Sequence, residues 1–151
     1  MIQSRNPQFE KRVRTFLERQ HFMHLIGFDL QHIAEGRTEG WLTLEEKHKQ
    51  QKGFAHGGLI ATLADITAGF AAYTLVPEDH HVVTAELKVS YFLPAVGHKL
   101  HAIGWVIKQG RKINFCEAEV WDVVEEAGQE PQRRLIAKAT TSMATVFPGD
   151  F

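Results

Sequence analysis

One carboxylate interrupts the most apolar segment of this chain. Asp65 is the only charged residue between Gly57 and Val76, and it follows a His-Gly-Gly sequence by seven residues. Burying a carboxylate without partners is costly, so such a group finds donors, becomes neutral or serves a function. Three explanations are open. Asp65 is a satisfied polar group, for example at a dimer interface, or lies in a transmembrane helix, or is a catalytic carboxylate beside a ligand cavity.

The two glycines before this segment favour the catalytic explanation. Gly57 and Gly58 begin the expected helix, where the first N–H groups have no partners within the helix and carry the positive end of its dipole. Such groups suit a carbonyl oxygen that gains negative charge. Asp65 lies about 10 Å further along the axis, too far to act on the same carbonyl. Antiparallel helices in a symmetric dimer would bring Asp65 near the partner's Gly57, so the spacing predicts a shared site.

The remaining elements must surround this helix. Periodic apolar residues predict an amphipathic helix over about residues 7–23. Alternating runs predict a hairpin at residues 26–33 and 37–44 and four later strands at residues 81–92, 98–109, 112–124 and 134–147. The order helix, two strands, helix, four strands predicts an α+β fold with one antiparallel sheet covering the apolar helix. A transmembrane helix fits the length of the segment, but its glycines and Asp65 argue against that assignment.

Composition limits the classes of function. A chain of 151 residues with 44% hydrophobic and 23% charged residues predicts a single domain over residues 1–151, with its core at about 26–147. The net charge of -1 gives no reason to expect nucleic acid or membranes as partners. Cys116 is the single cysteine, and no Cys/His spacing predicts a metal site. With no signal peptide pattern at the N-terminus, a cytoplasmic location is expected.

Two motifs carry a resemblance to a known family. The sequence H-G-G-x-x-x-x-L-x-D runs from His56 to Asp65, and the strand motif T-A-E-L-K-V-S-Y-F-L-P-A follows from Thr84. Over about residues 50–146 the chain resembles the hotdog-fold acyl-CoA thioesterases, especially their phenylacetate-pathway (PaaI-type) branch. The resemblance implies an antiparallel sheet wrapped around the central helix and a homodimer with a continuous sheet, often paired into a homotetramer.

The resemblance also implies roles for individual residues. Asp65 matches the family's catalytic carboxylate, which acts as general base or nucleophile. Gly57 matches the residue whose N–H polarises the thioester carbonyl, and His56 matches the motif histidine beside it. Thr84 lies where relatives carry a Ser or Thr that helps to hold the attacking water. Several relatives have an Asn six residues before the histidine, where it orients the water or the carbonyl. Gln50 stands at that position as the candidate for this role, and its amide, one carbon further out, could reach a displaced position or none.

A basic turn is the candidate contact for the coenzyme. The sequence from Lys108 to Lys112 matches a turn that often contacts the nucleotide end of CoA in relatives, and it includes Gly110 and Arg111. Its cations suit the phosphates of CoA, although a solvated hairpin tip would have the same composition. Together with the N–H of Gly58, these residues form the expected substrate-binding set. His56 has a structural alternative as well, because its ring could merely cap the helix.

The sequence therefore predicts a thioester hydrolase. Its expected substrate is an aryl or short- to medium-chain acyl-CoA, bound between two chains. No metal or redox cofactor is expected, since CoA enters as part of the substrate. Two alternatives on the same fold are a non-catalytic acyl-CoA binding module and an acyl-thioester hydratase. A binding module has no use for a costly buried carboxylate, and the Asp and Gly-Gly arrangement suits hydrolysis better than hydration.

Overall fold

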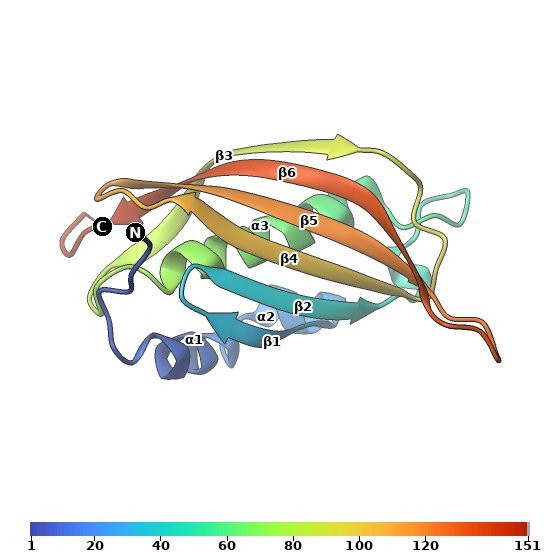
Figure 1. Cartoon of the computed structure of the whole chain (residues 1–151), viewed down its shortest axis with the longest axis horizontal. Coiled ribbons are helices and arrows are strands. Elements are labelled where there is room, and N and C mark those ends of the chain that lie inside the picture. The colour runs from blue at the N-terminus through green and yellow to red at the C-terminus, as the bar shows by residue number, and fades with distance from the viewer. Residues whose placement is uncertain (151) are drawn as a thin grey trace.

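The computed structural model describes residues 1–150, so the last residue of the expected domain, Phe151, lies outside the described residues. One antiparallel sheet curves around the long helix α3 (Gly57–Tyr73), as Figure 1 shows. The strands are β1 (Phe28–Ala34), β2 (Arg37–Thr43), β3 (His81–Tyr91), β4 (Lys99–Lys108), β5 (Ile113–Val124) and β6 (Gln132–Val146), in the order β1-β2-β4-β5-β6-β3. The predicted α+β class and the central helix are confirmed.

Helix α3 packs closely on the sheet because small residues meet at the contact. Ala64, Ala68 and Ala71 are buried on α3, and Gly104 faces them from β4. A Cβ atom at Gly104 would lie 2.4 Å from the backbone nitrogen of Ala68, so only glycine fits there. This contact fixes the height of the helix above the sheet. The opposite flank of α3, which carries Asp65, is left only partly covered.

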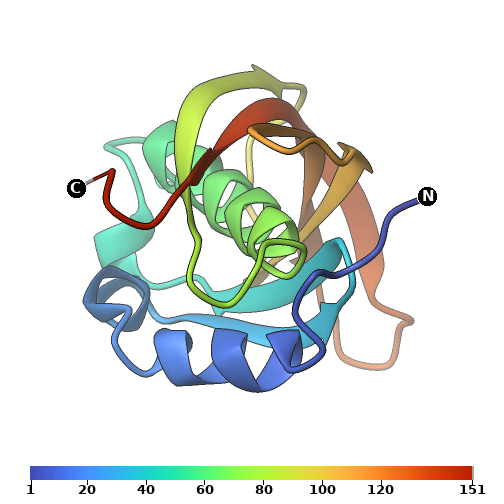
Figure 2. The ribbon, with the colours of Figure 1, turned by 90° about the vertical axis from the view of Figure 1, so that its left-hand side faces the viewer.

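The N-terminal region differs from the single helix predicted over about residues 7–23. It forms two helices, α1 (Phe9–Leu17) and α2 (His21–Ile26), which pack below α3 and the β1–β2 hairpin in Figure 2. Val13 and Met23 are both buried, yet in one straight helix their side chains would point about 80° apart. The break between the helices lets both face the core. The first strand accordingly begins at Phe28, later than expected, because Ile26 still belongs to α2.

Strand β3 forms one edge of the sheet and is largely exposed. It pairs with β6 alone among the described strands. The exposed apolar side chains Val83, Tyr91 and Phe92 lie on this strand or directly after it. A long edge strand with exposed apolar groups is a natural surface for pairing with another chain. No helix within residues 1–150 combines the length and the apolarity that crossing a bilayer requires.

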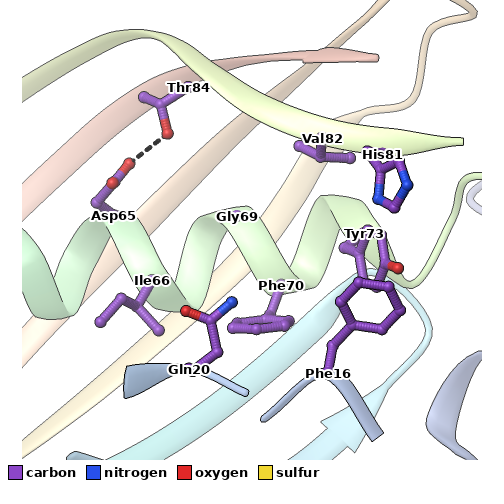
Figure 3. Close-up of a pocket in the computed structure, with 10 residues that line it drawn as sticks. All are labelled: Phe16, Gln20, Asp65, Ile66, Gly69, Phe70, Tyr73, His81, Val82 and Thr84. Atoms are coloured by element: carbon purple, nitrogen blue, oxygen red, sulfur yellow. Dashed lines mark hydrogen bonds between the residues drawn. The ribbon is translucent and has the colours of Figure 1, made fainter. Parts of the chain in front are cut away.

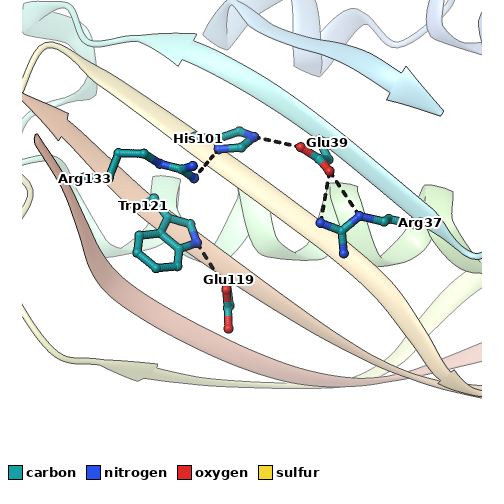
Figure 4. A network of polar contacts seen from close by, with 6 residues as sticks. All are labelled: Arg37, Glu39, His101, Glu119, Trp121 and Arg133. Atoms are coloured by element: carbon teal, nitrogen blue, oxygen red, sulfur yellow. Dashed lines mark hydrogen bonds and ion pairs between the residues drawn. The ribbon is translucent and has the colours of Figure 1, made fainter. Parts of the chain in front are cut away.

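A polar network covers the face of the sheet away from α3 (Figure 4). The Nε2 atom of His101 lies 3.2 Å from a carboxylate oxygen of Glu39, and Arg37 forms an ion pair with the same carboxylate. Arg133 donates to Nδ1 of His101 at 2.6 Å. Burial, assisted by the charge of Arg133, lowers the pKa of His101. The network joins β2, β4 and β6 on the face opposite Asp65, so it contributes to the sheet rather than to the candidate site.

Candidate functional site

Asp65 finds one donor across the gap between helix and sheet. The Thr84 hydroxyl on β3 donates to Oδ1 of Asp65 at 2.7 Å, and this is the only hydrogen bond to that carboxylate among residues 1–150 (Figure 3). The Thr84 oxygen also lies 3.5 Å from the sulfur of Met143. Thr84, predicted to hold the attacking water, thus orients the carboxylate itself. The second oxygen, Oδ2, remains available to another ligand.

A cavity of about 350 Å³ lies beside Asp65. It runs along α3 toward the end of the helix, between that helix, the start of β3 and the N-terminal helices (Figure 3). Most of its lining is apolar or aromatic: Phe16, Gln20, Asp65, Ile66, Gly69, Phe70, Tyr73, His81, Val82 and Thr84. An apolar cavity with a few polar groups at one end is the usual form of a small-molecule site.

The start of α3 has a different arrangement. Nδ1 of His56 accepts a hydrogen bond from the Gly58 N–H at 2.9 Å and so caps the helix. The Gly58 N–H, expected to contact substrate, is therefore already engaged. The Gly57 N–H has no hydrogen-bond acceptor among residues 1–150. A free N–H at the positive end of a 17-residue helix can receive a developing negative charge.

A buried histidine fixes the loop that leads into α3. His48 ends the short 3₁₀ helix η1 (Glu46–His48), and its Nε2 lies 2.7 Å from the carbonyl oxygen of Ile26. Its own carbonyl accepts from the N–H of His56 at 2.8 Å. The loop before α3 is thereby anchored to the N-terminal helices. This anchoring holds the first turn of α3 in place.

Gln50 lies on the same loop, near the start of α3. Together with Gly57 and Tyr91 it lines a second cavity, of about 330 Å³. The side-chain oxygen of Gln50 accepts from the N–H of Lys52, while its backbone N–H donates to Phe54. The side-chain oxygen of Gln50 is therefore engaged within its own loop, and its role in orienting the water or the carbonyl stays a prediction.

Tyr91 is a neighbour of Gly57 that the sequence did not single out. Its hydroxyl donates to the Gly57 carbonyl at 2.8 Å, and its ring lies 3.6 Å from where a Cβ of Gly57 would be. Burial raises the pKa of Tyr91. Tyr91 belongs to the strand motif that carries the resemblance, but its contact with Gly57 is visible only in the folded structure, where the end of β3 lies beside the start of α3. Similarly, nothing in the local sequence connects Phe16, Gln20 or His81 to Asp65.

Within one chain, the two halves of the candidate site are separate. The cavity beside Asp65 and the cavity beside Gly57 share no lining residue, and eight residues of helix span about 12 Å between them. The basic turn from Lys108 to Lys112 joins β4 to β5 at the end of the sheet where β3 begins, far from Gly57 (Figure 1). Its exposed Arg111 lies 6.0 Å from the ring of Phe147.

Comparisons with known proteins identify the family. The model of the Thioesterase superfamily matches residues 52–128, which is just over half of the chain and includes both motifs. The chain belongs to the Thioesterase superfamily. This membership confirms the resemblance drawn from the two motifs, and it makes the protein a thioester hydrolase.

Relatives in the Thioesterase superfamily agree along most of the chain. A thioesterase family protein from Silicibacter pomeroyi has a solved structure with a TM-score of 0.85 and 29% identity, covering 92% of this chain and 98% of that one. The PaaI protein of Escherichia coli shares the fold, with a TM-score of 0.78, 16% identity and coverage of 92% and 94%. The 1,4-dihydroxy-2-naphthoyl-CoA thioesterase 2 of Arabidopsis thaliana is 26% identical over 84% of this chain and 78% of its own length. The hotdog fold is thus confirmed.

The candidate site has no metal-binding cluster. Across residues 1–150, no three His, Cys, Asp or Glu side chains lie close enough together to hold a metal ion. Cys116, the single cysteine, is buried, and burial raises its pKa to about 12. Its thiol is therefore neutral at ordinary pH and a poor nucleophile. Asp65, Thr84 and the free Gly57 N–H remain the candidate groups for a hydrolytic site.

Proposed function

We propose that this protein hydrolyses acyl-CoA thioesters at a site formed by two chains. The observation that carries the proposal is the half-buried carboxylate of Asp65, held by Thr84 at the mouth of an aromatic cavity, in a chain of the Thioesterase superfamily. Asp65 and its cavity come from one chain, and the free N–H comes from the partner's Gly57. The exposed edge strand β3 supports such a pairing, because its Thr84 contacts Asp65 and its Tyr91 contacts Gly57.

The reaction needs one base and one oxyanion donor. Asp65 takes a proton from water, and the resulting hydroxide adds to the carbonyl carbon of the thioester. The oxygen of the tetrahedral intermediate accepts a hydrogen bond from the partner's Gly57 N–H. The carbon–sulfur bond then breaks, and the CoA thiolate leaves and takes up the proton that Asp65 accepted from water. Direct attack by Asp65 on the carbonyl would use the same geometry and pass through an anhydride that water hydrolyses.

The coenzyme and the acyl group occupy different surfaces. The cavity beside Asp65 suits the acyl group because most of its lining is apolar. The phosphates of CoA are assigned to the turn from Lys108 to Lys112, which belongs to the same chain as the base. The cations of this turn are exposed, as a site for a solvated phosphate requires.

Thiol release from a panel of acyl-CoAs tests the proposal, with Gly57→Pro as the informative variant. Proline removes the N–H, is well tolerated at the first position of a helix, and suits the extended backbone of His56 before it (φ -65, ψ 135). Loss of one oxyanion donor is expected to lower kcat about 10² to 10³-fold. Gly57→Ala is the matched control, because it keeps the N–H. Its added Cβ would lie 3.6 Å from the Tyr91 ring, which is an ordinary van der Waals contact.

Two results would contradict the proposal. Wild-type activity in Gly57→Pro would show that its N–H stabilises no oxyanion. Binding of acyl-CoA by the wild-type protein without any thiol release would instead indicate the non-catalytic binding module.

A further inference from the structure

Three aromatic rings from distant parts of the chain meet at the far end of the cavity beside Asp65. Phe16 on α1 packs edge-on against Tyr73 of α3, with ring centroids 5.4 Å apart. The ring of His81, at the start of β3, lies 5.8 Å from that of Phe16. Figure 3 shows this cluster at the opposite end of the cavity from the Asp65–Thr84 pair. The N-terminal segment thus closes a cavity whose other walls are the central helix and the sheet.

Helix α1 is held firmly enough to act as a wall. The Arg12 guanidinium donates to the carbonyl oxygens of Pro77 and His80, just before β3. The same group lies 4.1 Å above the ring of Tyr73. Val13, on the next position, is completely buried. These contacts fix α1 to both elements that frame the cavity, so the position of Phe16 is set by the fold.

The break between α1 and α2 completes the wall. Gln20 lies in this break, and its side chain reaches toward α3 beside Phe70 (Figure 3). Its side-chain amide has no hydrogen bond to any of residues 1–150. The break therefore directs the polar side chain of Gln20 into the middle of the cavity, while Phe16 on α1 lies at its end.

We propose that α1, through Phe16, sets the upper length limit of the acyl group. This inference rests on the proposed acyl-CoA hydrolysis, with the acyl group in the cavity beside Asp65. Tyr73 lies eight residues beyond Asp65, or about 12 Å along the helix axis. An acyl group that extends past this point must displace the Phe16 ring from Tyr73 and His81. Phe16 is thus a specificity-determining residue, and aryl or short- to medium-chain acyl groups are the substrate class that fits.

The exposure of Phe16 makes this limit removable. The residue is 36% exposed, so its outer side faces solvent while its inner side closes the cavity. Truncation of the side chain would open the end of the cavity to solvent instead of leaving a sealed void. Longer acyl groups could then pass out beside α1.

The test compares kcat/KM across straight-chain acyl-CoAs of increasing length. In Phe16→Ala we expect kcat/KM to rise about tenfold for acyl groups beyond the wild-type optimum and to change less than about threefold for shorter ones. Phe16→Leu, which keeps more of the packing, should give an intermediate profile. Leu25→Ala is the matched control: Leu25 is 69% exposed on α2, away from the cavity lining, and its removal should leave the profile unchanged.

Two outcomes would overturn the inference. One is a folded Phe16→Ala protein with the wild-type length optimum, and the other is an equal shift in Leu25→Ala. If the wild-type protein releases no thiol from any acyl-CoA, the proposed function fails. The length limit set by Phe16 is then tested by measuring Kd for the same acyl-CoAs by calorimetry. A length dependence of Kd that is identical in wild type and Phe16→Ala would then contradict it.

Discussion

Two aspartates of this chain lie beside the core, and their surroundings are opposite. Asp122 on β5 has a fully buried side chain, and it accepts hydrogen bonds from the N–H groups of Val96 and Gly97 and from Arg134. Asp65 on α3 is half-buried, accepts from Thr84 alone and borders a cavity of about 350 Å³. Both are carboxylates at least partly withdrawn from solvent. Only one has its acceptor capacity filled.

The difference is the one expected between a structural carboxylate and a general base. A buried charge with several donors and a cation is balanced, and it ties together the segments that supply those donors. Asp122 joins the turn before β4 to strands β5 and β6 in this way. Asp65 keeps one oxygen free and faces open space. A general base requires both properties, because it must take a proton from a bound molecule.

The largest expected effect is on turnover in Asp65→Asn. Loss of a general base is expected to lower kcat for acyl-CoA hydrolysis about 10² to 10⁴-fold. The melting temperature should change little, because the amide can still accept from Thr84. Thiol release and thermal unfolding of the same preparation measure both. Full turnover in Asp65→Asn would remove the distinction between the two aspartates.

Asp122→Asn should show the reverse pattern. The substitution weakens the charge-assisted hydrogen bonds that the buried carboxylate accepts from Arg134, whose side chain is 36% exposed, and from two backbone N–H groups, and this loss is expected to cost about 1.5 to 3 kcal/mol of unfolding free energy. The protein that remains folded should hydrolyse acyl-CoA with wild-type kcat. Urea unfolding and active-site-normalised rates check the two statements. A stable but inactive variant would assign Asp122 to the reaction.

Thr84→Val tests whether the single donor orients Asp65. A hydrogen bond to a charged group is worth about 1.5 to 3 kcal/mol, so kcat is expected to fall about tenfold or more. The matched control is Thr140→Val on β6, an exposed threonine whose hydroxyl bonds to none of residues 1–150. Equal rates in Thr84→Val and wild type would mean that Asp65 needs no orienting partner.

His56→Ala should have the smallest effect. Its ring caps α3, and loss of a cap costs about 1 kcal/mol of stability. His56→Asn, which restores a capping acceptor, should recover the melting temperature. If the ring only caps, kcat should stay within about threefold of wild type in both variants. A rate that falls in both, despite the restored cap in Asn, would give the imidazole a chemical role.

Sequence patterns predicted the parts of the molecule that depend on local order. Composition and spacing predicted the apolar helix around Asp65, the strands after it and the α+β class. The two-helix N-terminus did not, because burial of both Val13 and Met23 is a property of the packed chain. The contacts of Tyr91 with Gly57 and of Phe16 with Tyr73 join residues 34 and 57 positions apart, which no local pattern encodes.

The central claim, that two chains share the site, is tested most directly by mixing two inactive variants. Asp65→Asn and Gly57→Pro chains are unfolded together, refolded at equal concentrations and assayed for thiol release. In a mixed dimer, one site carries both substitutions and the other is intact, so random pairing should restore about one quarter of wild-type activity. If each site lay within one chain, every site would carry a substitution. No recovery above the two separate variants would contradict the account.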